Sequence, residues 1–485
     1  MAATPKTIEK SVLKKDSAEI KPRRVKNFLN NELLDHARYV IETRAMPNIM
    51  DGMRVGARKV LWAALTGDLK NAAKVKMPSL VGDALKNHYN HGDLSLQNTI
   101  VQLCSTHLNK YAPLDVIGQI DNLRGKCKTA PRYLHVKKSK YIDFFKTDFE
   151  LLERTYDDGD YNEPKYFLPV VPLALVYRTN SPGFGFSYSC FSYDMDEIID
   201  NCIKSVTIGT CKDDIDSLPL MPYVEGIKPE NIIYNANKGQ WFNVGEYTVD
   251  VEKDTLTITD LPYNIMLEDY DEHLRNLAEK YYILTFSDLS LDGKIKYNIQ
   301  FPKGRLKEYI KDQWKFYQTM KLFTKVRKDI LNFIDIDGKT ILAFDTPQEV
   351  IDAFVKRRLK VYDLRKTRTI KIIKEDLVDL ENKIKFITLV NDDELIISKR
   401  KIEDIKQDLD IIHKLPHDVL KLNIDKLTAE EIEKLKAKAT ELQIQLDYIL
   451  KATPQEMYIR DLVEFKKVYG NINSGINNNS KTVEL

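Results

Sequence analysis

Apolar residues follow a helical spacing through the first part of the chain and a different pattern after about residue 165. Up to about residue 150 they recur every three or four positions, as in FLNNELLDHARYVIETRAM (28–46) and RKVLWAAL (58–65), and this spacing predicts helices. Further along, β-branched and aromatic runs such as YFLPVVPLALVY (166–177) and DTLTITDLPYNIML (254–267) predict strands broken by Pro, Gly and Asn. We therefore expect a mixed α/β region after a helical one.

The last third of the chain predicts long helices with capped starts. A threonine followed three residues later by glutamate can cap a helix, and this pattern occurs three times, at Thr346, Thr428 and Thr453. Apolar positions then alternate in steps of three and four over residues 370–387, 402–412 and 432–449. This is the spacing of a coiled-coil seam. Because Asn391–Glu394 separates the first two seams, we predict an antiparallel pair of long helices, with an ordinary helical bundle as the alternative.

These patterns divide the chain into five segments. The polar and basic residues 1–25 predict a disordered arm, and the low-complexity residues 471–485 predict a disordered tail. A length of 485 residues exceeds one ordinary hydrophobic core. We therefore expect three folded parts between the tails, with bounds at residues 26–150, 151–345 and 346–470.

Composition narrows the class of protein. The chain is 43% hydrophobic and 30% charged, with a net charge of +2, which is typical of a globular protein. It has no apolar run of about 18 residues that could span a membrane, and its first residues lack the apolar core of a secretory signal. Five cysteines without CxxC spacing argue against a disulfide framework or zinc site and favour a reducing compartment.

A basic stripe surrounds Tyr133. Residues 121–146 hold eight cations against two acids, and such a stripe is a typical footprint of phosphate binding. A phenol is a weak nucleophile because its ordinary pKa is about 10, so attack on a phosphodiester needs a positive field and cations for the phosphoryl oxygens. Arg132 and its neighbours could supply both. A charge cluster more often serves only as a solvated surface or to position nucleic acid, so the stripe alone favours that role over catalysis and leaves both open.

Several sequence blocks, in one order, resemble the type IIA DNA topoisomerases. TRAMPNIMDGMRVGARKVLWAAL (43–65) resembles the signature that opens their breakage-reunion region, VGDALKNHYNHGD (81–93) resembles their next helix and His-Gly turn, and APRY (130–133) falls at their catalytic Arg-Tyr pair. The order continues through EPKYFLPVVPLALV (163–176), TITDLPYN (257–264), DTPQEVIDAFVKRRLKVYDLRK (345–366) and ATPQEMYIRDLVEF (452–465). The chain is similar to gyrase A, to the C-terminal half of the eukaryotic enzyme and to the medium subunit of large-phage topoisomerases, and we favour the phage type.

The resemblance implies a multidomain α+β fold. It assigns a winged-helix domain with the catalytic tyrosine to residues 26–150 and an α/β tower domain with a DNA-wedge loop to residues 151–345. A long antiparallel coiled-coil arm with a helical exit-gate domain is assigned to residues 346–470. It also implies that Tyr133 attacks a backbone phosphate and becomes joined to the 5′ end of the cut strand, while Arg132 stabilises the charge of the transition state.

The resemblance further implies a set of DNA-binding residues. Arg58, Lys59 and His91 match residues near the DNA backbone, and the basic stripe adds Arg124, Lys126 and Lys128. Phe184, in the loop SPGFGFSYS, stands where the family has an isoleucine that wedges between base pairs. The chain also departs from the family at GQIDNLRGKCK (118–128), where a Gly-Phe-Gly stretch is usual, so the approach loop is expected to bind DNA differently.

The chemistry implied by the resemblance is shared with a partner. Members of the family hold Mg²⁺ with a Glu and a DxD pair in a separate acidic domain, and neither Asp214/Asp216 nor Asp335/Asp337 here follows an apolar strand with a partnering Glu. A GxxxxGK[ST] loop for ATP is also missing from the sequence. We expect a homodimer joined at the DNA gate and the C-gate, acting on double-stranded DNA with a separate subunit that binds Mg²⁺ and ATP. No metal site and no membrane partner are expected for this chain. Its expected place is intracellular, with DNA, in the host cytoplasm if it is a phage protein and in the cytoplasm or nucleoid otherwise.

Two other classes of protein share features with this sequence. A non-catalytic, dimeric DNA-clamping or chromosome-organising protein could use the same scaffold, and the altered approach loop and wedge are compatible with it. The pair Arg132 and Tyr133 favours the enzyme. A tyrosine recombinase is disfavoured, because its dispersed set of Arg, His and Arg is not recognisable in the sequence.

Overall fold

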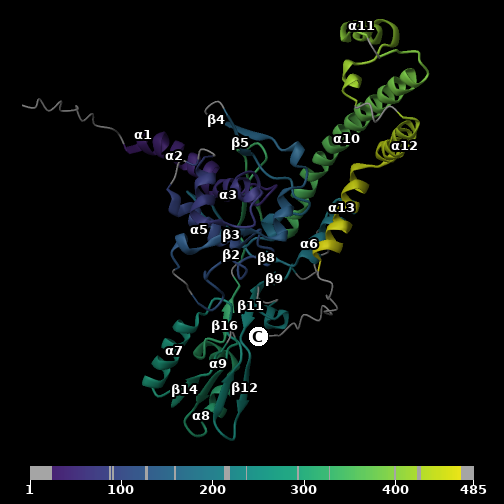
Figure 1. The fold of residues 1–485 in the computed structure, drawn as a ribbon. Coiled ribbons are helices and arrows are strands. Elements are labelled where there is room, and N and C mark those ends of the chain that lie inside the picture. Colours follow the sequence, from purple (N-terminus) through teal and green to yellow (C-terminus); the bar gives the residue numbers. More distant parts are fainter. Residues whose placement is uncertain are drawn as a thin grey trace, which may run out of the picture.

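The computed structural model describes residues 25–470 except 87–88, 90–91, 126–128, 158–159, 212–218, 225, 236–237, 292–293, 327, 398–399 and 423–427. Figure 1 shows a mixed α/β body, a sheet lobe (residues 247–322) on one side of it, and a helical arm (residues 346–452) that projects from it. The mixed α/β character is confirmed. Among the helices of the described residues, none has the length and apolarity needed to cross a membrane.

The first part of the body is helical, as the hydrophobic spacing predicts. It contains α1 (Val25–Asn30), α2 (Glu32–Val40) with a π-helical turn (Ile41–Ala45), α3 (Val55–Thr66), α4 (Met77–Leu85) and α5 (Asp93–Cys104). Helices α3, α4 and α5 contact one another, and α3 buries the whole stretch from Ala57 to Leu65. A small antiparallel sheet follows, in the order β1-β3-β2, from β1 (Val75–Lys76), β3 (His135–Lys138) and β2 (Leu114–Ile117).

The strand expected at residues 166–177 is wrong. This stretch is nearly all buried, but it is irregular chain that ends in a 3-10 turn at Leu173–Leu175. Pro169 and Pro172 interrupt it, and proline cannot donate to a strand ladder. Burial explains the apolar run, and the prolines explain why no strand forms.

Short hairpins and a helix complete this half of the body. The hairpins are β4 (Arg154–Asp157) with β5 (Asp160–Pro164) and β6 (Thr179–Pro182) with β7 (Ser187–Cys190). A separate antiparallel pair joins β8 (Ser192–Tyr193) to β9 (Pro222–Tyr223), which lies beyond the helix in the sequence. Helix α6 (Met195–Ile208) lies beside α10 (Pro347–Asn391) and α13 (Pro454–Tyr469). A further pair, β17 (Leu331–Ile334) and β18 (Ile341–Phe344), leads into the arm.

One hydrophobic core joins segments that the sequence analysis assigned to different domains. The ring of Phe145 contacts that of Phe167, with centroids 5.2 Å apart, so the expected boundary at residue 150 runs through a packed core. Helix α13 (Pro454–Tyr469) returns from the arm to the same core, where the hydroxyl of Tyr458 donates to the carbonyl of Val170 at 2.8 Å.

The sheet lobe has a core of its own. Its antiparallel sheet has the order β12-β13-β15-β14, from β12 (Tyr247–Asp250), β13 (Thr255–Ile258), β15 (Tyr297–Gln300) and β14 (Thr285–Asp288). Alternate residues of β13 and β15 pack with α7 (Leu267–Glu279), α8 (Arg305–Lys311) and α9 (Gln313–Thr319). Strand β13 confirms the strand predicted there. The sheet of β10 (Ile232–Asn235), β11 (Gln240–Val244) and β16 (Phe323–Lys325) connects the lobe to the body.

The arm is built on α10 (Pro347–Asn391), a helix of 45 residues. Arg358 and Arg365 fix its base, because both bind the carboxylate of Asp148 in the body at 2.5 Å. Helix α12 (Ala429–Lys451) packs along α10 (Figure 1). The predicted caps are confirmed, since the hydroxyls of Thr346, Thr428 and Thr453 each accept from the backbone N–H three residues on.

The structure confirms burial of the predicted apolar positions in two of the three stretches of the arm. The predicted pairing of the first stretch with the second is wrong. Every predicted seam position of residues 370–387 and 432–449 is buried or half-buried. Residues 402–412, however, form only the short α11 (Ile402–Asp408) and a π-helical turn (Leu409–His413). These fold back on the end of α10 as a small apolar cluster, and α12 takes the place beside α10. The names winged helix, tower and coiled coil stay predictions.

Candidate functional site

Tyr133 lies at the surface beside a buried anchor. It ends a 3-10 turn (Pro131–Tyr133), and its N–H donates to the carbonyl of Ala130 at 3.0 Å. The next residue, Leu134, is buried, and its carbonyl accepts from the N–H of Met77 at the start of α4 at 3.0 Å. Tyr133 itself is 63% exposed. The turn is therefore fixed to the small sheet and α4 while the phenol is open to a large ligand.

Arg132 places a positive charge beside this phenol. Its guanidinium carbon lies 4.9 Å from the centroid of the Tyr133 ring, within the range of a cation–π contact. Both side chains are exposed. The pair can therefore present a nucleophilic oxygen and a cation to the same phosphate, as attack on a phosphodiester requires.

A polar cleft of about 790 Å³ opens between α2, the start of α3 and α5. Its lining carries three cations and a group of hydroxyl and amide side chains: Arg44, Arg54, Lys59, Tyr39, Thr43, Tyr89, Ser95, Asn98, Thr99 and Gln102. Such a mixture of fixed donors suits phosphate and sugar contacts better than an apolar ligand.

Arg54 is the residue of this cleft that the sequence analysis missed. Burial lowers the pKa of its guanidinium, and its side chain donates to the amide oxygen of Gln102 at 3.5 Å. A partly buried cation that is held by an amide oxygen, with no carboxylate in that bond, is stabilised by an anionic ligand. The sequence offered one signal for it, because Arg54 lies two residues after Gly52 in the quoted signature.

Arg58 is buried and serves the turn before it. Its side chain binds Asp51 through two hydrogen bonds of 2.8 and 3.1 Å and donates to the carbonyl of Met53 at 2.9 Å. Asp51 in turn accepts from the N–H groups of Met53 and Phe167. The role of Asp51 and Arg58 in this buried network is a structural reason for both residues of the signature. A DNA contact of Arg58 stays a prediction, and at 5% exposure it would need this network to open.

Lys59 occupies the floor of the cleft but is already paired. Its ammonium lies 2.8 Å from a carboxylate oxygen of Glu163, and both side chains are buried. The pair joins α3 to β5 across the body. A DNA contact of Lys59 likewise stays a prediction.

Phe184 sits in the turn of the β6–β7 hairpin. Both Phe184 and Phe186 are exposed there, and the ring of Phe184 lies edge-on to His36 of α2, with centroids 6.0 Å apart. An exposed aromatic pair on a tight hairpin has the shape that insertion between base pairs requires. The wedge role stays a prediction.

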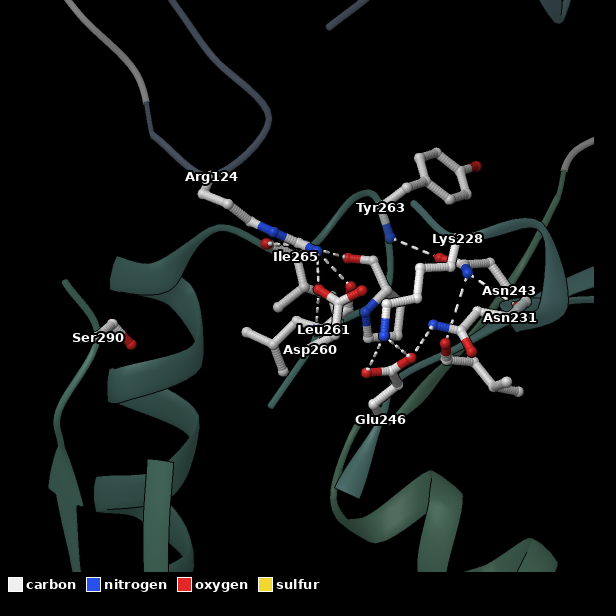
Figure 2. A network of polar contacts seen from close by, with 12 residues as sticks. Arg124, Lys228, Asn231, Asn243, Glu246, Asp260, Leu261, Tyr263, Ile265 and Ser290 are labelled. Atoms are coloured by element: carbon white, nitrogen blue, oxygen red, sulfur yellow. Dashed lines mark hydrogen bonds and ion pairs between the residues drawn. The ribbon is translucent and has the colours of Figure 1, made fainter. Parts of the chain in front are cut away.

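Of the remaining predicted DNA-binding residues, the structure describes one and leaves three outside its described part. His91, Lys126 and Lys128 lie outside the described residues. Arg124 is described, and Figure 2 shows its side chain directed into the sheet lobe, where it contacts Asp260 and neighbouring carbonyls. The basic stripe of the sequence is therefore not one continuous surface, since Arg124 is engaged inside the protein.

The aspartate pair that the structure describes does not fit a magnesium site. Asp335 is bound by Arg357 at 2.7 and 2.8 Å. Asp337 accepts from the hydroxyl and the N–H of Thr340, and these hydrogen bonds, with that of the hydroxyl first, lower the pKa of the Asp337 carboxyl to about 2. Within the described part of the chain, His, Cys, Asp and Glu do not gather in threes that could bind a metal. Asp214 and Asp216 lie outside this part.

Comparison with known proteins adds the decisive observation. Residues 44–465 match the DNA gyrase/topoisomerase IV family, in its A subunits. The chain belongs to this family. The sequence assignment to the breakage-reunion region of type IIA topoisomerases is thereby confirmed.

Individual relatives agree with the topoisomerase assignment. The chain is 30% identical over 417 residues to DNA topoisomerase 2 of Plasmodium falciparum, covering 84% of this chain and 28% of that protein. It is 26% identical over 529 residues to DNA topoisomerase 2 of Acanthamoeba polyphaga mimivirus, covering 91% of this chain and 40% of that protein. The chain thus spans well under half the length of these topoisomerase relatives.

A solved topoisomerase structure has a similar fold. The DNA-binding, cleavage and re-ligation domain of Plasmodium falciparum topoisomerase II superposes with a TM-score of 0.76 and 26% identity. The match covers 91% of this chain and 65% of that one. The mixed α/β architecture is therefore that of a topoisomerase II cleavage region.

Proposed function

We propose that this chain is the DNA-cleaving and religating subunit of a type IIA topoisomerase, with Tyr133 as its nucleophile. The observation that carries the proposal is the exposed phenol of Tyr133 beside the guanidinium of Arg132, at the Arg-Tyr position of a chain that matches the family over residues 44–465. The turn that holds the phenol is anchored by Leu134 and α4, so the nucleophile is presented in a defined place.

The proposed reaction exchanges one phosphoester for another. The phenolic oxygen of Tyr133 attacks the phosphorus and forms a bond to it, and the bond from phosphorus to the 3′ oxygen breaks. The phenol gives up its proton, and the departing 3′ oxygen takes one up to become a hydroxyl. Because the number of phosphoester bonds is unchanged, the reverse attack by the 3′ hydroxyl reseals the strand. Arg132 offsets the charge that develops on the phosphoryl oxygens.

The cleft and the hairpin supply the proposed contacts with duplex DNA. Arg54 and Arg44 offer positive charge to the backbone, and the hydroxyl and amide groups of α5 add hydrogen-bond donors. Phe184 at the tip of the β6–β7 hairpin would insert between base pairs, which costs stacking but lets a bent duplex contact more protein.

The tip of the arm supports the proposed C-gate of a homodimer. Four isoleucines are exposed on or near the small apolar cluster at the end of α10: Ile396, Ile402, Ile411 and Ile412. Exposed aliphatic residues gathered on one small domain mark an association surface. A second copy of the chain that covers them would close a gate behind the passing duplex, with the DNA gate at the other end.

The proposed reaction cycle also involves a partner subunit. We assign Mg²⁺ and ATP to a separate subunit that joins this chain. For Mg²⁺ the support is the described pair Asp335 and Asp337, which does not fit the ion, and for ATP it is the lack of a GxxxxGK[ST] loop in the sequence. We derive no step of this chain through the metal. Such a complex acts on double-stranded DNA and belongs inside the cell, with the DNA.

Plasmid cleavage tests this function. The chain and its Mg²⁺- and ATP-binding partner would be mixed with supercoiled plasmid and ATP and stopped with detergent. We expect protein-linked linear DNA with the wild-type chain and none with Tyr133→Phe, although both bind the plasmid equally. Equal DNA binding without cleavage by the wild-type chain would instead identify a DNA clamp.

A further inference from the structure

The side chain of Arg124 is a clamp on the sheet lobe. One terminal nitrogen, Nη1, donates to the carbonyls of Pro262 and Ile265 at 2.6 and 3.3 Å. The other, Nη2, donates to the carboxylate of Asp260 at 2.8 Å and to the carbonyl of Leu261. Figure 2 shows these acceptors arranged around the guanidinium. The planar fork of arginine therefore ties four points of one lobe segment together.

The backbone around Arg124 holds the same segment. The carbonyl of Arg124 accepts from the N–H of Leu267 at 3.2 Å, which is the first residue of α7. Before it, the side-chain oxygen of Asn122 accepts from the N–H groups of Arg124 and Gly125 and fixes the turn. Leu123 packs against the apolar cluster at the connecting sheet, which includes Ile232 of β10 and Trp241 of β11. Side chain, backbone and neighbours thus seat the approach loop on the lobe.

The receiving segment is itself held in place. The N–H of Tyr263 donates to the side-chain oxygen of Asn243 at 2.8 Å, and the amide of Asn243 donates to the carbonyl of Asn231 at 3.0 Å. Asn243 is buried. The N–H of Glu246 donates to the carbonyl of Asp260 at 3.1 Å. The segment that Arg124 contacts is therefore fixed to the connecting sheet of β10 and β11 as well as to the lobe.

The charged groups of Arg124 and Asp260 are largely occupied by contacts with each other and with the nearby backbone. The side chains of Arg124 and Asp260 are 11% and 16% exposed. Burial lowers the pKa of Arg124, and burial raises the pKa of Asp260 although the arginine opposes that rise. A guanidinium that already serves one carboxylate and three carbonyls has little left to offer a DNA phosphate.

The clamp and the nucleophile lie on one short loop. Arg124 precedes Tyr133 by nine residues, and both lie in the connection from β2 to β3, in which residues 126–128 are outside the described part of the chain. Its far end is fixed to the body by the hydrogen bond between Leu134 and Met77. The loop that carries the tyrosine is therefore attached to the sheet lobe at one end and to the body at the other.

We propose that Arg124 is a positioning residue that couples the sheet lobe to the tyrosine turn. The inference rests on the proposed function, because it assumes that Tyr133 is the nucleophile. When the lobe is held by bound DNA, the clamp fixes the approach loop and with it the placement of Tyr133 against the scissile phosphate. Arg124 then acts on cleavage through the lobe and not by binding DNA, which replaces the role that the sequence predicted for it.

Substitution on both sides of the clamp separates these two roles. Either Arg124→Ala or Asp260→Ala removes the ion pair between the approach loop and the lobe. Both variants should therefore lower the rate of covalent adduct formation by about ten- to a hundredfold, the typical cost of a misplaced reacting group. DNA affinity and its salt dependence should stay unchanged. Lys228→Ala is the matched control, since Lys228 binds Glu246 in the same network without touching the loop, and it should cleave normally.

A direct DNA contact predicts the opposite pattern. Loss of a phosphate contact weakens binding and lowers the salt slope by about one, and Asp260→Ala, which removes a negative charge, would leave cleavage intact or improve it. Arg124→Lys should also restore a phosphate contact, but a single ammonium cannot serve four acceptors. Normal cleavage by Asp260→Ala, or rescue by Arg124→Lys, would overturn the proposal.

A measurement that does not depend on catalysis tests the inference separately from the proposed function. Hydrogen exchange of residues 129–134 and 261–267 in the free chain should quicken in Arg124→Ala and in the milder Asp260→Asn, and not in Lys228→Ala. Thermal unfolding would show that the variants are folded. Unchanged exchange in both loop segments would refute the clamp, whereas a wild-type chain that forms no adduct but shows this exchange pattern would refute only the function.

Discussion

Gly52 decides the geometry of the turn that opens the signature. Its φ is +66°, and a Cβ there would lie 2.4 Å from the backbone nitrogen of Ala174. Either property alone is unfavourable for any other residue. Together with the buried pair of Asp51 and Arg58, the glycine fixes the start of α3 and so the position of the cleft.

The close approach at Gly52 predicts a stability difference between two glycines. Gly52→Ala should cost about 2 to 5 kcal/mol, from the left-handed backbone and the overlap with Ala174. Gly185 is the control, because its φ is +73° but a Cβ would meet nothing within 4 Å, so Gly185→Ala should cost about 1 to 2 kcal/mol. Urea unfolding measures both. Equal losses would show that the contact with Ala174 is unimportant.

Glu197 at the start of α6 predicts a pH dependence. Burial, with a smaller contribution from Asp194, raises the pKa of its carboxyl from 4.5 to about 7. The folded chain then holds this proton more tightly than the unfolded chain, so the contribution of Glu197 to stability is present below about pH 4.5 and is lost as pH rises to about 7.

The variant Glu197→Gln isolates this effect. It keeps the size of the side chain but cannot ionise, so it should be more stable than the wild type at pH 8 and similar to it at pH 4.5. Unfolding curves over this pH range measure the difference. Parallel pH profiles for the two proteins would contradict the prediction.

For single residues, the sequence shows which side chains are charged or nucleophilic better than it shows which groups those side chains contact. The basic stripe and the Arg-Tyr pair could be read directly, and the structure exposes Arg132 and Tyr133. Arg58, Lys59 and Arg124 read equally as cations for DNA, because a sequence does not show which carboxylate or carbonyl a long side chain will reach. The tertiary fold brings Glu163 to Lys59 and Asp260 to Arg124 from more than a hundred positions away, and Asp51 reaches Arg58 through the turn that precedes α3.

Among the secondary elements, the long helices follow their hydrophobic seams. Leu380 lies on the buried side of α10 at 5% exposure, whereas Val378, two residues earlier, is 55% exposed. Leu380→Ala should therefore cost about 2 to 5 kcal/mol, and Val378→Ala should change stability by less than about 0.5 kcal/mol. Denaturant unfolding followed by helical circular dichroism compares them, and similar losses would argue against a packed seam.

Helices were predictable where several local signals agreed. They were not predictable where the chain folds back on itself, as after α10. A capping threonine, a proline at the first helical position and a glutamate after it coincide at the start of α10 and of α13, and both helices begin there. Residues 402–412 carry the same spacing, yet Lys414 has a left-handed backbone and Pro416 follows it. The helix therefore ends early, and its apolar side closes on Phe386 and Leu389 instead. Spacing alone does not report how long a helix continues.

On the scale of the whole molecule, the exposed arm tip predicts contact between two copies. Ile411 is 76% exposed at the tip, while Ile372 is exposed halfway along α10. Under mild oxidation Ile411→Cys should form a covalent dimer in high yield, and Ile372→Cys should not. Denaturing gels measure the yield. Equal yields at the two positions would argue against a gate at the tip.

The arrangement of the parts could be predicted only through the family. Local patterns suggested separate folded parts, but the core that joins Phe145, Phe167 and Tyr458 depends on contacts between residues up to about three hundred positions apart. No local pattern encodes such contacts. The resemblance to type IIA topoisomerases supplied the order of the parts, and the family match confirmed that assignment.

The most direct test of the account is to find the residue that carries DNA. Adducts trapped with plasmid, ATP and the partner subunit would be digested with nuclease and protease, and mass spectrometry would locate the remaining nucleotide. The account predicts a nucleotide on the peptide that contains Tyr133, joined through its 5′ phosphate and absent in Tyr133→Phe. A nucleotide on another residue, or an adduct that persists in Tyr133→Phe, would contradict it.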